Sequence, residues 1–384
     1  MSALADLYTV PPEHVELRDT IRQIARERIA PRAAEIDREA SYPHDLRALL
    51  GEQDILGLPF EPEYGGTGTG TLMLNIAVEE IAKADASTAL ILMIQDLGTL
   101  PIRLHGSEEL RRRFLPRCAT GELSPAFALS EAEAGSDAGG LQTTATRDGD
   151  EWVINGSKAW ITNSGIADFY CVFAVTDRSA GHAHGITAFV VEADRPGFSV
   201  GKLEHKLGIR ASPTGSPVFD NVRVPQANVI GEVGQGFKVA MSTLDRSRLG
   251  VAAQALGIAQ GATDYAVAYA RERRAFGQPI NSFQGIQFKL ADMETKCAAG
   301  RELLYQACCR ADREDPELGK YSAMAKLFCS DTAMEVTVEA VQVLGGYGYV
   351  NDYPVERMMR DAKITQIYEG TNEIQRLVVA RSLR

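Results

Sequence analysis

One carboxylate in the C-terminal half of the chain has the setting of a general base. Glu369 follows a segment, 364–368, that contains two isoleucines and a tyrosine, and it precedes Gly370, where the backbone can approach a ligand closely. An apolar site raises the pKa of a carboxylate toward neutrality, as a base working near pH 7 requires. Thr371 or Asn372 is typical of a residue that caps a helix beginning here. A surface or capping glutamate fits the same pattern, so both interpretations stay open at this level.

The distribution of histidine limits the other chemistries. No histidine lies beyond position 205, so proton transfer in the C-terminal half falls to a carboxylate, Lys, Tyr or Cys. The run GFSVG at 197–201 matches a hydrolase nucleophile elbow, but no Asp separates Ser199 from His205, so a turn or strand edge is favoured over a serine hydrolase. His182 and His184 lack the neighbouring ligands of a metal centre, which predicts that the chain binds no metal.

Two upstream segments have the residue types that hold a planar, polar cofactor. Residues 127–140 (FALSEAEAGSDAGG) concentrate Ser130, Ser136 and several glycines, whose hydroxyls and free N–H groups suit phosphate oxygens and cofactor edges. Residues 154–165 place Trp160 near a threonine, and the two could stack on a ring system and hydrogen-bond to it. A structural turn and a core tryptophan explain the same two patterns. No glycine cluster fits G-x-G-x-x-G after a strand, so a nicotinamide site is disfavoured.

The elements that must position these residues fall into three blocks. Helical periodicity is followed by short runs rich in β-branched and aromatic residues, and helical periodicity then returns. This order predicts an α+β protein with an N-terminal helical domain (1–124), a central antiparallel β domain (125–235) and a C-terminal helical domain (236–384). The expected helices include 71–84, 87–105, 107–120, 237–272, 283–312, 317–345, 353–363 and 372–382.

Composition fits a soluble folded protein and removes several classes of partner. Of 384 residues, 45% are hydrophobic and 24% are charged, which is ordinary for a globular chain. The net charge of −11 has the wrong sign for nucleic acid as a partner. The longest apolar stretch, 89–94, is far shorter than the ~20 residues that a membrane-spanning helix needs. Six cysteines without a C-x-x-C pair, and an N-terminus without a signal-peptide pattern, predict free thiols and a cytoplasmic location.

Taken together, these segments resemble the acyl-CoA dehydrogenase family, flavoenzymes that desaturate acyl-CoA thioesters between the α and β carbons. ALSEAEAGSDAGG (128–140) is similar to the family's first signature, and QVLGGYGYVNDYPVERMMRD (342–361) to its second. With the family-like WITN, HKLGIR, RERRAFGQPI and YEGTNEIQ, the resemblance covers essentially the whole chain. It implies non-covalent FAD, a β-barrel-like central domain, a C-terminal four-helix bundle and a homotetramer built as a dimer of dimers. It also implies electron-transferring flavoprotein as the electron acceptor.

The resemblance further implies which residues hold FAD. Most belong to the two upstream segments and to the C-terminal signatures. Arg273 and Gln284 would reach the FAD of a neighbouring subunit, with the arginine matched to its pyrophosphate. The implied cofactor residues are Phe127, Leu129, Ser130, Gly135, Ser136, Trp160, Ile161, Thr162, Arg273, Phe276, Gln284, Gln342, Gly345, Gly346, Thr371 and Glu373.

Within this resemblance Glu369 looks like the catalytic base. In similar enzymes its backbone N–H and a ribityl hydroxyl of FAD bind the thioester oxygen, and these bonds strengthen as enolate charge develops. Some relatives carry the base in a D-x-E-R context, but here that segment is DRSR (245–248), so Ser247 occupies the alternative site and cannot act as a base. The implied substrate-binding residues are Ser136, Asp245, Arg248, Tyr368 and Gly370.

The expected substrate is a short- to medium-chain acyl-CoA, straight or simply branched, as in fatty acid β-oxidation. Leu92, Met93 and Ile94 are bulky and resemble the floor of an acyl pocket, although a core position explains them equally. Ala132-Glu133 stands where many members have Pro-Gly, which affects the local turn. Alternatives on the same fold are a dehydrogenase or oxidase of secondary metabolism or of carrier-protein-bound acyl groups, and a non-catalytic relative that binds flavin or CoA.

Overall fold

The N-terminal block is helical, as the sequence predicts. The structure, a computed structural model, describes residues 10–181 and 183–383. One helix expected over 87–105 is instead two, because the chain turns at Gly98 and a new helix begins with Pro101 in its first turn. A Cβ at Gly98 would lie 2.6 Å from the Pro125 side chain, so the turn also lets the sheet approach. The helices are α1 (Pro12–Ile24), α2 (Ala33–Glu39), α3 (His44–Glu52), α4 (Gly70–Ala82), α5 (Ala86–Leu97), α6 (Leu100–His105) and α7 (Glu108–Ala119).

The central block is one nine-stranded sheet in the order β4-β8-β3-β2-β5-β6-β9, with β1 beside β5 and β7 beside β8. Most pairs are antiparallel, but β1 and β2 both run parallel to β5, so the sheet is mixed where the sequence predicted an antiparallel one. Residue alternation reports burial and not strand direction, and the long connections to β5 permit parallel pairing. The strands are β1 (Pro125–Ala128), β2 (Thr144–Asp148), β3 (Glu151–Ser157), β4 (Ile161–Thr162), β5 (Phe169–Val175), β6 (Ile186–Glu192), β7 (Phe198–Leu203), β8 (Thr214–Pro225) and β9 (Val229–Ile230).

Strand β5 is buried on both faces and divides two hydrophobic cores. Phe169, Cys171 and Phe173 pack with α7 and the start of the C-terminal helices, while Tyr170 and Val172 pack inside the sheet domain. Strand β1 also contacts β4, which brings the two halves of the sheet together. Ser199 lies within β7, which is followed by another strand, so the nucleophile-elbow geometry of strand, turn and helix is absent at this serine.

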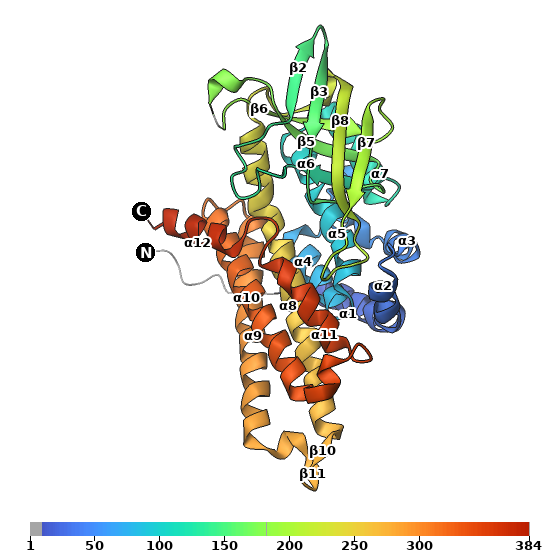
Figure 1. Ribbon diagram of the computed structural model, residues 1–384, viewed down its shortest axis with the longest axis vertical. Helices are drawn as coiled ribbons and strands as arrows, with labels where there is room; N and C mark the ends of the chain where they lie inside the picture. Colours follow the sequence, from blue (N-terminus) through green and yellow to red (C-terminus); the bar gives the residue numbers. More distant parts are fainter. Residues whose placement is uncertain (1–9, 182, 384) are drawn as a thin grey trace.

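The C-terminal block is a bundle of long helices with a small hairpin at one end (Figure 1). Close helix packing is possible because Gly257 and Gly261 face the backbone of the α4 region, where a Cβ would lie 2.4–2.5 Å from carbonyl oxygens. In Figure 1 the sheet lies at one end of the long axis and the β10–β11 hairpin at the other. The elements are α8 (Gly236–Glu272), β10 (Arg274–Ala275), β11 (Gln278–Pro279), α9 (Gln284–Asp312), α10 (Leu318–Leu344), α11 (Pro354–Thr365) and α12 (Asn372–Arg381).

The structure also bears on the state of the cysteines and on membrane-spanning helices. All six cysteines are free thiols, and five of them are buried, as predicted. Across the described parts of the chain, no helix combines the length and apolar character that a bilayer crossing needs.

Candidate active site

Glu369 lies in a tight turn between α11 and α12. Both Glu369 (φ +54°) and Gly370 (φ +92°) adopt left-handed backbone conformations, which a glycine accepts freely and a glutamate rarely does. A Cβ at position 370 would lie 2.7 Å from the Gln375 side-chain nitrogen. The hydroxyl of Thr371 accepts from the Ile374 N–H and caps α12, as the sequence predicted for this threonine or its neighbour. The turn is therefore a strained, defined geometry that needs support from its surroundings.

That support comes from three side chains that bind the two carbonyls of the turn. Gln375 Nε2 donates to the Gly370 carbonyl at 2.8 Å and to the Glu369 carbonyl at 3.2 Å. Arg248 Nε donates to the Glu369 carbonyl at 3.4 Å, and Lys326 Nζ donates to the Gly370 carbonyl at 2.9 Å. Sequence reasoning gave Gln375 and Lys326 no role, because neither lies in a pattern that predicts contact with this turn.

The carboxyl of Glu369 points to α8. Ser247 Oγ donates to Glu369 Oε2 at 2.5 Å, across 122 positions of the chain. Burial raises the pKa of the Glu369 carboxyl to about 7, while the Ser247 hydrogen bond and the charges of Arg248 and Lys326 oppose that rise. A carboxyl in this state exchanges a proton near neutral pH, which is the property a general base requires. Ser247, at the position where some relatives carry the base, thus contacts the Glu369 carboxyl directly.

Arg248 and Asp245, which the resemblance assigns to contact with CoA, form an ion pair on α8. The Arg248 side chain is 4% exposed, and Nη1 donates to Asp245 Oδ1 at 2.6 Å while Nε reaches the Glu369 carbonyl. Asp245 retains 40% side-chain exposure. The Arg248 guanidinium therefore stabilises the Glu369–Gly370 turn, called the base turn below after the predicted role of Glu369. In the Arg248–Asp245 ion pair, Asp245 is the more accessible side chain.

Behind Glu369, a polar contact joins α8 to the preceding tyrosine. The Tyr368 hydroxyl donates to Gln254 Oε1, and Gln254 Nε2 donates to the Ala86 carbonyl at 2.9 Å. Gln254 is fully buried. A Cβ at Gly250 would lie 3.6 Å from Met93 Cγ, so Met93 faces α8 between Ser247 and Gln254. Leu92, Met93 and Ile94 are all buried, and Met93 is the one of the three for which the contact with α8 is established.

The two segments proposed for the cofactor lie side by side. The Ala159 N–H donates to the Ser130 carbonyl at 3.0 Å. Beneath them Lys158 Nζ donates to Glu131 Oε1 at 2.7 Å and to the Leu129 carbonyl at 3.1 Å. Burial lowers the pKa of Lys158 to about 8, and the charge of Glu131 partly offsets this. Sequence reasoning missed this buried pair, since a glutamate and a lysine 27 positions apart carry no signal of contact.

Above this pair the surface offers groups of the kind that a flavin needs. Trp160 is 64% exposed and has a left-handed backbone (φ +63°), so the core-tryptophan alternative is wrong. Thr162 is half-buried, Ile161 is buried, and Gly135 and Ser136 are exposed. An exposed indole beside uncharged hydroxyl and backbone donors fits a flat ring system with polar edges. Leu129 is buried, while Phe127 and Ser130 are partly accessible.

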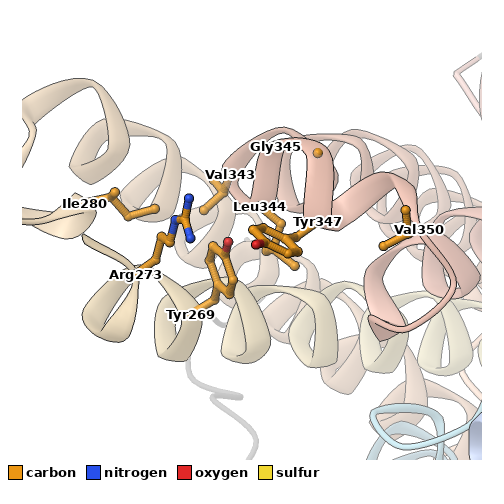
Figure 2. Close-up of a pocket in the computed structure, with 9 residues that line it drawn as sticks. Tyr269, Arg273, Ile280, Val343, Leu344, Gly345, Tyr347 and Val350 are labelled. Atoms are coloured by element: carbon orange, nitrogen blue, oxygen red, sulfur yellow. The ribbon is translucent and has the colours of Figure 1, made fainter. Parts of the chain in front are cut away.

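A second set of predicted cofactor residues gathers at the far end of the bundle. A hollow of about 470 Å³ is bordered by Tyr269, Arg273, Tyr347 and the backbone of Gly345 and Gly346 (Figure 2). The Arg273 guanidinium lies 5.2 Å from the centre of the Tyr347 ring. The other cofactor residues predicted at this end of the bundle are all exposed: Phe276, which is 94% exposed, Gln284 and Gln342.

The two sets of predicted cofactor residues lie on different elements of the fold. Arg273 adjoins the β10–β11 hairpin, which lies at one end of the long axis (Figure 1), whereas Trp160 directly precedes β4, which pairs with the start of β8. Thr371 and Glu373 lie with the base turn at the start of α12. The predicted cofactor residues are thus divided among the sheet surface, the α12 start and the far hollow.

Metal-ligand groupings are absent where the structure allows a search. In residues 10–181 and 183–383 no three potential His, Cys, Asp or Glu ligands gather. Of the two histidines considered above as metal ligands, His182 lies outside the described residues and His184 lies in a turn.

In chain order, helices precede and follow a mixed sheet, and the turn between α11 and α12 carries a carboxyl whose pKa burial raises to about 7. Family comparisons agree with the resemblance seen in the sequence. Models described as the acyl-CoA dehydrogenase N-terminal, middle and C-terminal domains match residues 11–122, 126–222 and 234–384. The chain therefore belongs to the acyl-CoA dehydrogenase family. It is an oxidoreductase whose cofactor is FAD, and its substrates are acyl-CoA thioesters.

Individual relatives extend over nearly the whole chain. It is 51% identical over 380 residues to a probable acyl-CoA dehydrogenase of Mycobacterium leprae, covering 99% of this chain and 97% of the relative. It is 47% identical over 375 residues to the mitochondrial short-chain specific acyl-CoA dehydrogenase of Mus musculus, covering 97% and 90%. The solved butyryl-CoA dehydrogenase of Megasphaera elsdenii superposes with a TM-score of 0.96 at 46% identity, covering 98% of this chain and 99% of that one.

Proposed function

We propose that this enzyme oxidises a short- to medium-chain acyl-CoA, straight or simply branched, to the trans-2-enoyl-CoA, with Glu369 as the base. The observation that carries the proposal is the Glu369 carboxyl itself. Burial sets its pKa at about 7, and Ser247 holds one oxygen at 2.5 Å from the hydroxyl. A base with this pKa is ionised in useful proportion at neutral pH and still binds the proton it removes.

The α-proton of a thioester is weakly acidic, so its removal needs a positioned base and stabilisation of the enolate oxygen. Glu369 takes the α-proton, and the backbone N–H of the same residue is the proposed donor to the thioester oxygen. The fixed turn keeps the carboxyl and this N–H in one relative geometry, because its carbonyls are bound by Arg248, Gln375 and Lys326. When bound, FAD accepts the hydride from the β carbon, which completes the double bond.

The residues proposed to hold FAD are those of the sheet surface, the α12 start and the far hollow. Trp160 would cover the ring system, and Ser130, Ser136 and Thr162 would supply hydroxyls to its polar edges. Arg273 would bind the pyrophosphate of a neighbouring subunit's FAD, as the family resemblance implies, since it lies beside the β10–β11 hairpin and outside the sheet domain that carries Trp160. This division supports a homotetramer, built as a dimer of dimers, in which each cofactor site is completed by a second chain.

The preference for a short acyl chain rests on the length of α8 between two contacts. Ser247 touches the base, and Gln254, seven positions further, is tied to Tyr368 and to the Ala86 carbonyl. Seven helical residues span about 10 Å along the helix axis. The Met93 side chain faces Gly250 within this stretch of α8 and reduces the space for an acyl chain there. This distance along α8 suits a short acyl chain. The similar proteins of Mus musculus and Megasphaera elsdenii are named as short-chain specific and butyryl-CoA dehydrogenases. The proposal also includes electron-transferring flavoprotein as the electron acceptor and a role in fatty acid β-oxidation. A cytoplasmic location is proposed as well, and the six free thiols support it.

The test is anaerobic titration of the purified, yellow enzyme with butyryl-, isobutyryl-, hexanoyl-, octanoyl- and palmitoyl-CoA. Bleaching of the flavin by the shorter members, with palmitoyl-CoA the poorest, is the expected result. Bleaching by palmitoyl-CoA alone would overturn the chain-length assignment. A flavoprotein that no acyl-CoA bleaches would move the substrate to a carrier-bound thioester or mark a non-catalytic relative. Reoxidation by electron-transferring flavoprotein and not by oxygen would separate the dehydrogenase from an oxidase.

A further inference from the structure

Lys326 is a fully buried lysine that none of the family signatures contains. It lies in the middle of α10, and its ammonium group ends against the turn that carries Glu369. Nζ donates to the Gly370 carbonyl at 2.9 Å and to the Asn372 side-chain oxygen at 2.8 Å. An uncompensated buried ammonium is costly, so these contacts need an energetic or functional reason.

The acceptors of Lys326 are themselves fixed. Asn372 Nδ2 donates to Ser330 Oγ at 2.9 Å and to Asp331 Oδ1 at 2.7 Å, and both residues lie on α10 beyond Lys326. The Asn372 N–H donates to the Gln366 carbonyl at 3.0 Å across the turn. Lys326 therefore joins α10 to Gly370, the residue next to the proposed base, and to Asn372 at the start of α12.

We propose that Lys326 is a positioning residue: it clamps the left-handed Glu369–Gly370 turn against α10, and its ammonium charge keeps the Glu369 carboxyl ionised for proton abstraction. The inference rests on the proposed role of Glu369 as the base. The hydrogen bonds of Lys326 go to the Gly370 carbonyl in the turn and to the Asn372 side chain, so Lys326 would act on the reaction through Glu369.

Electrostatics agree with this geometry. Burial lowers the pKa of Lys326 to about 7, and the charge of Glu369 raises it. Burial raises the pKa of Glu369 to about 7, and the charges of Arg248 and Lys326 lower it. The two groups thus stabilise each other's charged forms. The other ionisable groups that act on this pair are Asp96 on α5, Arg248 on α8, which is paired with Asp245, Asp331 on α10, the adjacent Tyr368 and Glu373 on α12.

Three variants separate the clamp from the charge. Lys326→Met removes the donor and the charge, and Lys326→Gln retains a polar donor without the charge. Lys320→Met is the matched control, because Lys320 lies on the same helix and pairs with Glu317 at the surface. Each is loaded with FAD, and the rate of anaerobic flavin bleaching by a saturating acyl-CoA is followed from pH 5.5 to 9.5, together with KM, the flavin spectrum and the melting temperature.

The charge role predicts that the pH midpoint of bleaching moves upward in both Lys326 variants and stays in place in Lys320→Met. A rise of about one in the pKa of Glu369 leaves up to about tenfold less ionised base on the acid side and little difference at high pH. The clamp role predicts that Lys326→Met also loses rate at high pH, with KM little changed, whereas Lys326→Gln recovers most of that loss.

An unchanged midpoint in both variants would overturn the charge role, and full high-pH activity in Lys326→Met would overturn the clamp. Absence of folded protein in both variants would assign Lys326 to stability alone and would also overturn the proposal. Failure of the proposed function is distinguishable, because it would appear as a parent enzyme that no acyl-CoA bleaches.

Discussion

The base turn and the far hollow differ in how their residues are held. At the base turn, Glu369 and Gly370 receive hydrogen bonds from α8, α10 and α12, so the geometry for proton transfer is complete within one chain. At the far hollow, Arg273 faces Tyr347 and an open surface, and Phe276 beside it is 94% exposed. The comparison shows that the turn at Glu369 is fixed by contacts within one chain, whereas the residues of the far hollow remain open to solvent in the single chain.

The sheet surface lies between these extremes. Its exposed Trp160 resembles the far hollow in accessibility, but the segments beneath it are fixed by the buried Lys158–Glu131 pair. The residues predicted to touch the cofactor here are thus accessible in the single chain, and buried contacts set the positions of their segments.

The largest effect is expected at the base itself. Glu369→Gln should lower the rate of anaerobic flavin reduction about 10³-fold, because Gln keeps the shape and accepts the Ser247 hydrogen bond but cannot take a proton. The bound FAD and the melting temperature should be unchanged. Glu335→Gln, at an exposed carboxylate on α10, is the control. If the variant reduced flavin at a rate within tenfold of the parent, another residue would have to be the base, and the base turn would not be the site of proton transfer.

Removing one partner of the buried pair should destabilise the protein. Lys158→Met leaves the Glu131 carboxylate buried without its cation, which typically costs about 3–5 kcal/mol. Urea unfolding, monitored by circular dichroism, gives the change in the free energy of unfolding. The double variant Lys158→Met/Glu131→Gln should recover part of this loss. A loss below about 1 kcal/mol would show that the pair is not what fixes the sheet surface.

Arg273→Ala probes the divided site. Loss of a charged contact to a phosphate should weaken FAD binding about tenfold or more and lower the population of the tetramer. Arg271→Ala, at an exposed arginine of the same helix end, should leave both unchanged. The measurements are the FAD-to-protein ratio after gel filtration and the mass by sedimentation. A fully flavinated, tetrameric Arg273→Ala would contradict the assignment of this hollow to a neighbour's cofactor.

The pH dependence sharpens the description of the base turn. Since the pKa of Glu369 is about 7, its carboxyl is protonated at lower pH and unable to accept the α-proton, so the rate should fall as pH decreases. For one ionising group the rate should differ about tenfold between pH 6 and pH 8. Stopped-flow bleaching at saturating substrate measures it. A rate independent of pH over this range would place the controlling pKa elsewhere.

The smallest effect concerns chain length. Gln254→Ala should raise the rate with octanoyl-CoA relative to butyryl-CoA about fivefold, because it shortens the side chain that is tied to Tyr368. Gly250→Ala should act in the opposite direction, since the added Cβ would contact Met93 at 3.6 Å. The ratio of kcat/KM values for the two substrates is the measurement. An unchanged ratio in both variants would remove α8 as the determinant of length.

Local features of the fold were predictable, and long-range features were not. The helix boundaries from α8 to α12 agree with the sequence periodicity to within about two residues, in keeping with the short range of helical hydrogen bonds. The division of 87–105 into α5 and α6 and the parallel pairing of β1 with β5 depend on how the sheet packs against the helices. Trp160 and Arg273 were selected by resemblance, but the exposure of Trp160 and the position of Arg273 at the far hollow required the structure.

The sequence by itself determined the order of helical and sheet blocks, the lack of histidine in the C-terminal half and the position of a glutamate before glycine at 369–370. These follow from residue type and short-range spacing. The tertiary structure decided that Ser247 and Lys326 meet the base turn and that Lys158 supports the cofactor surface. Such contacts join residues 27 to 122 positions apart, and they exist because helix and strand packing brings buried polar groups to partners that satisfy them.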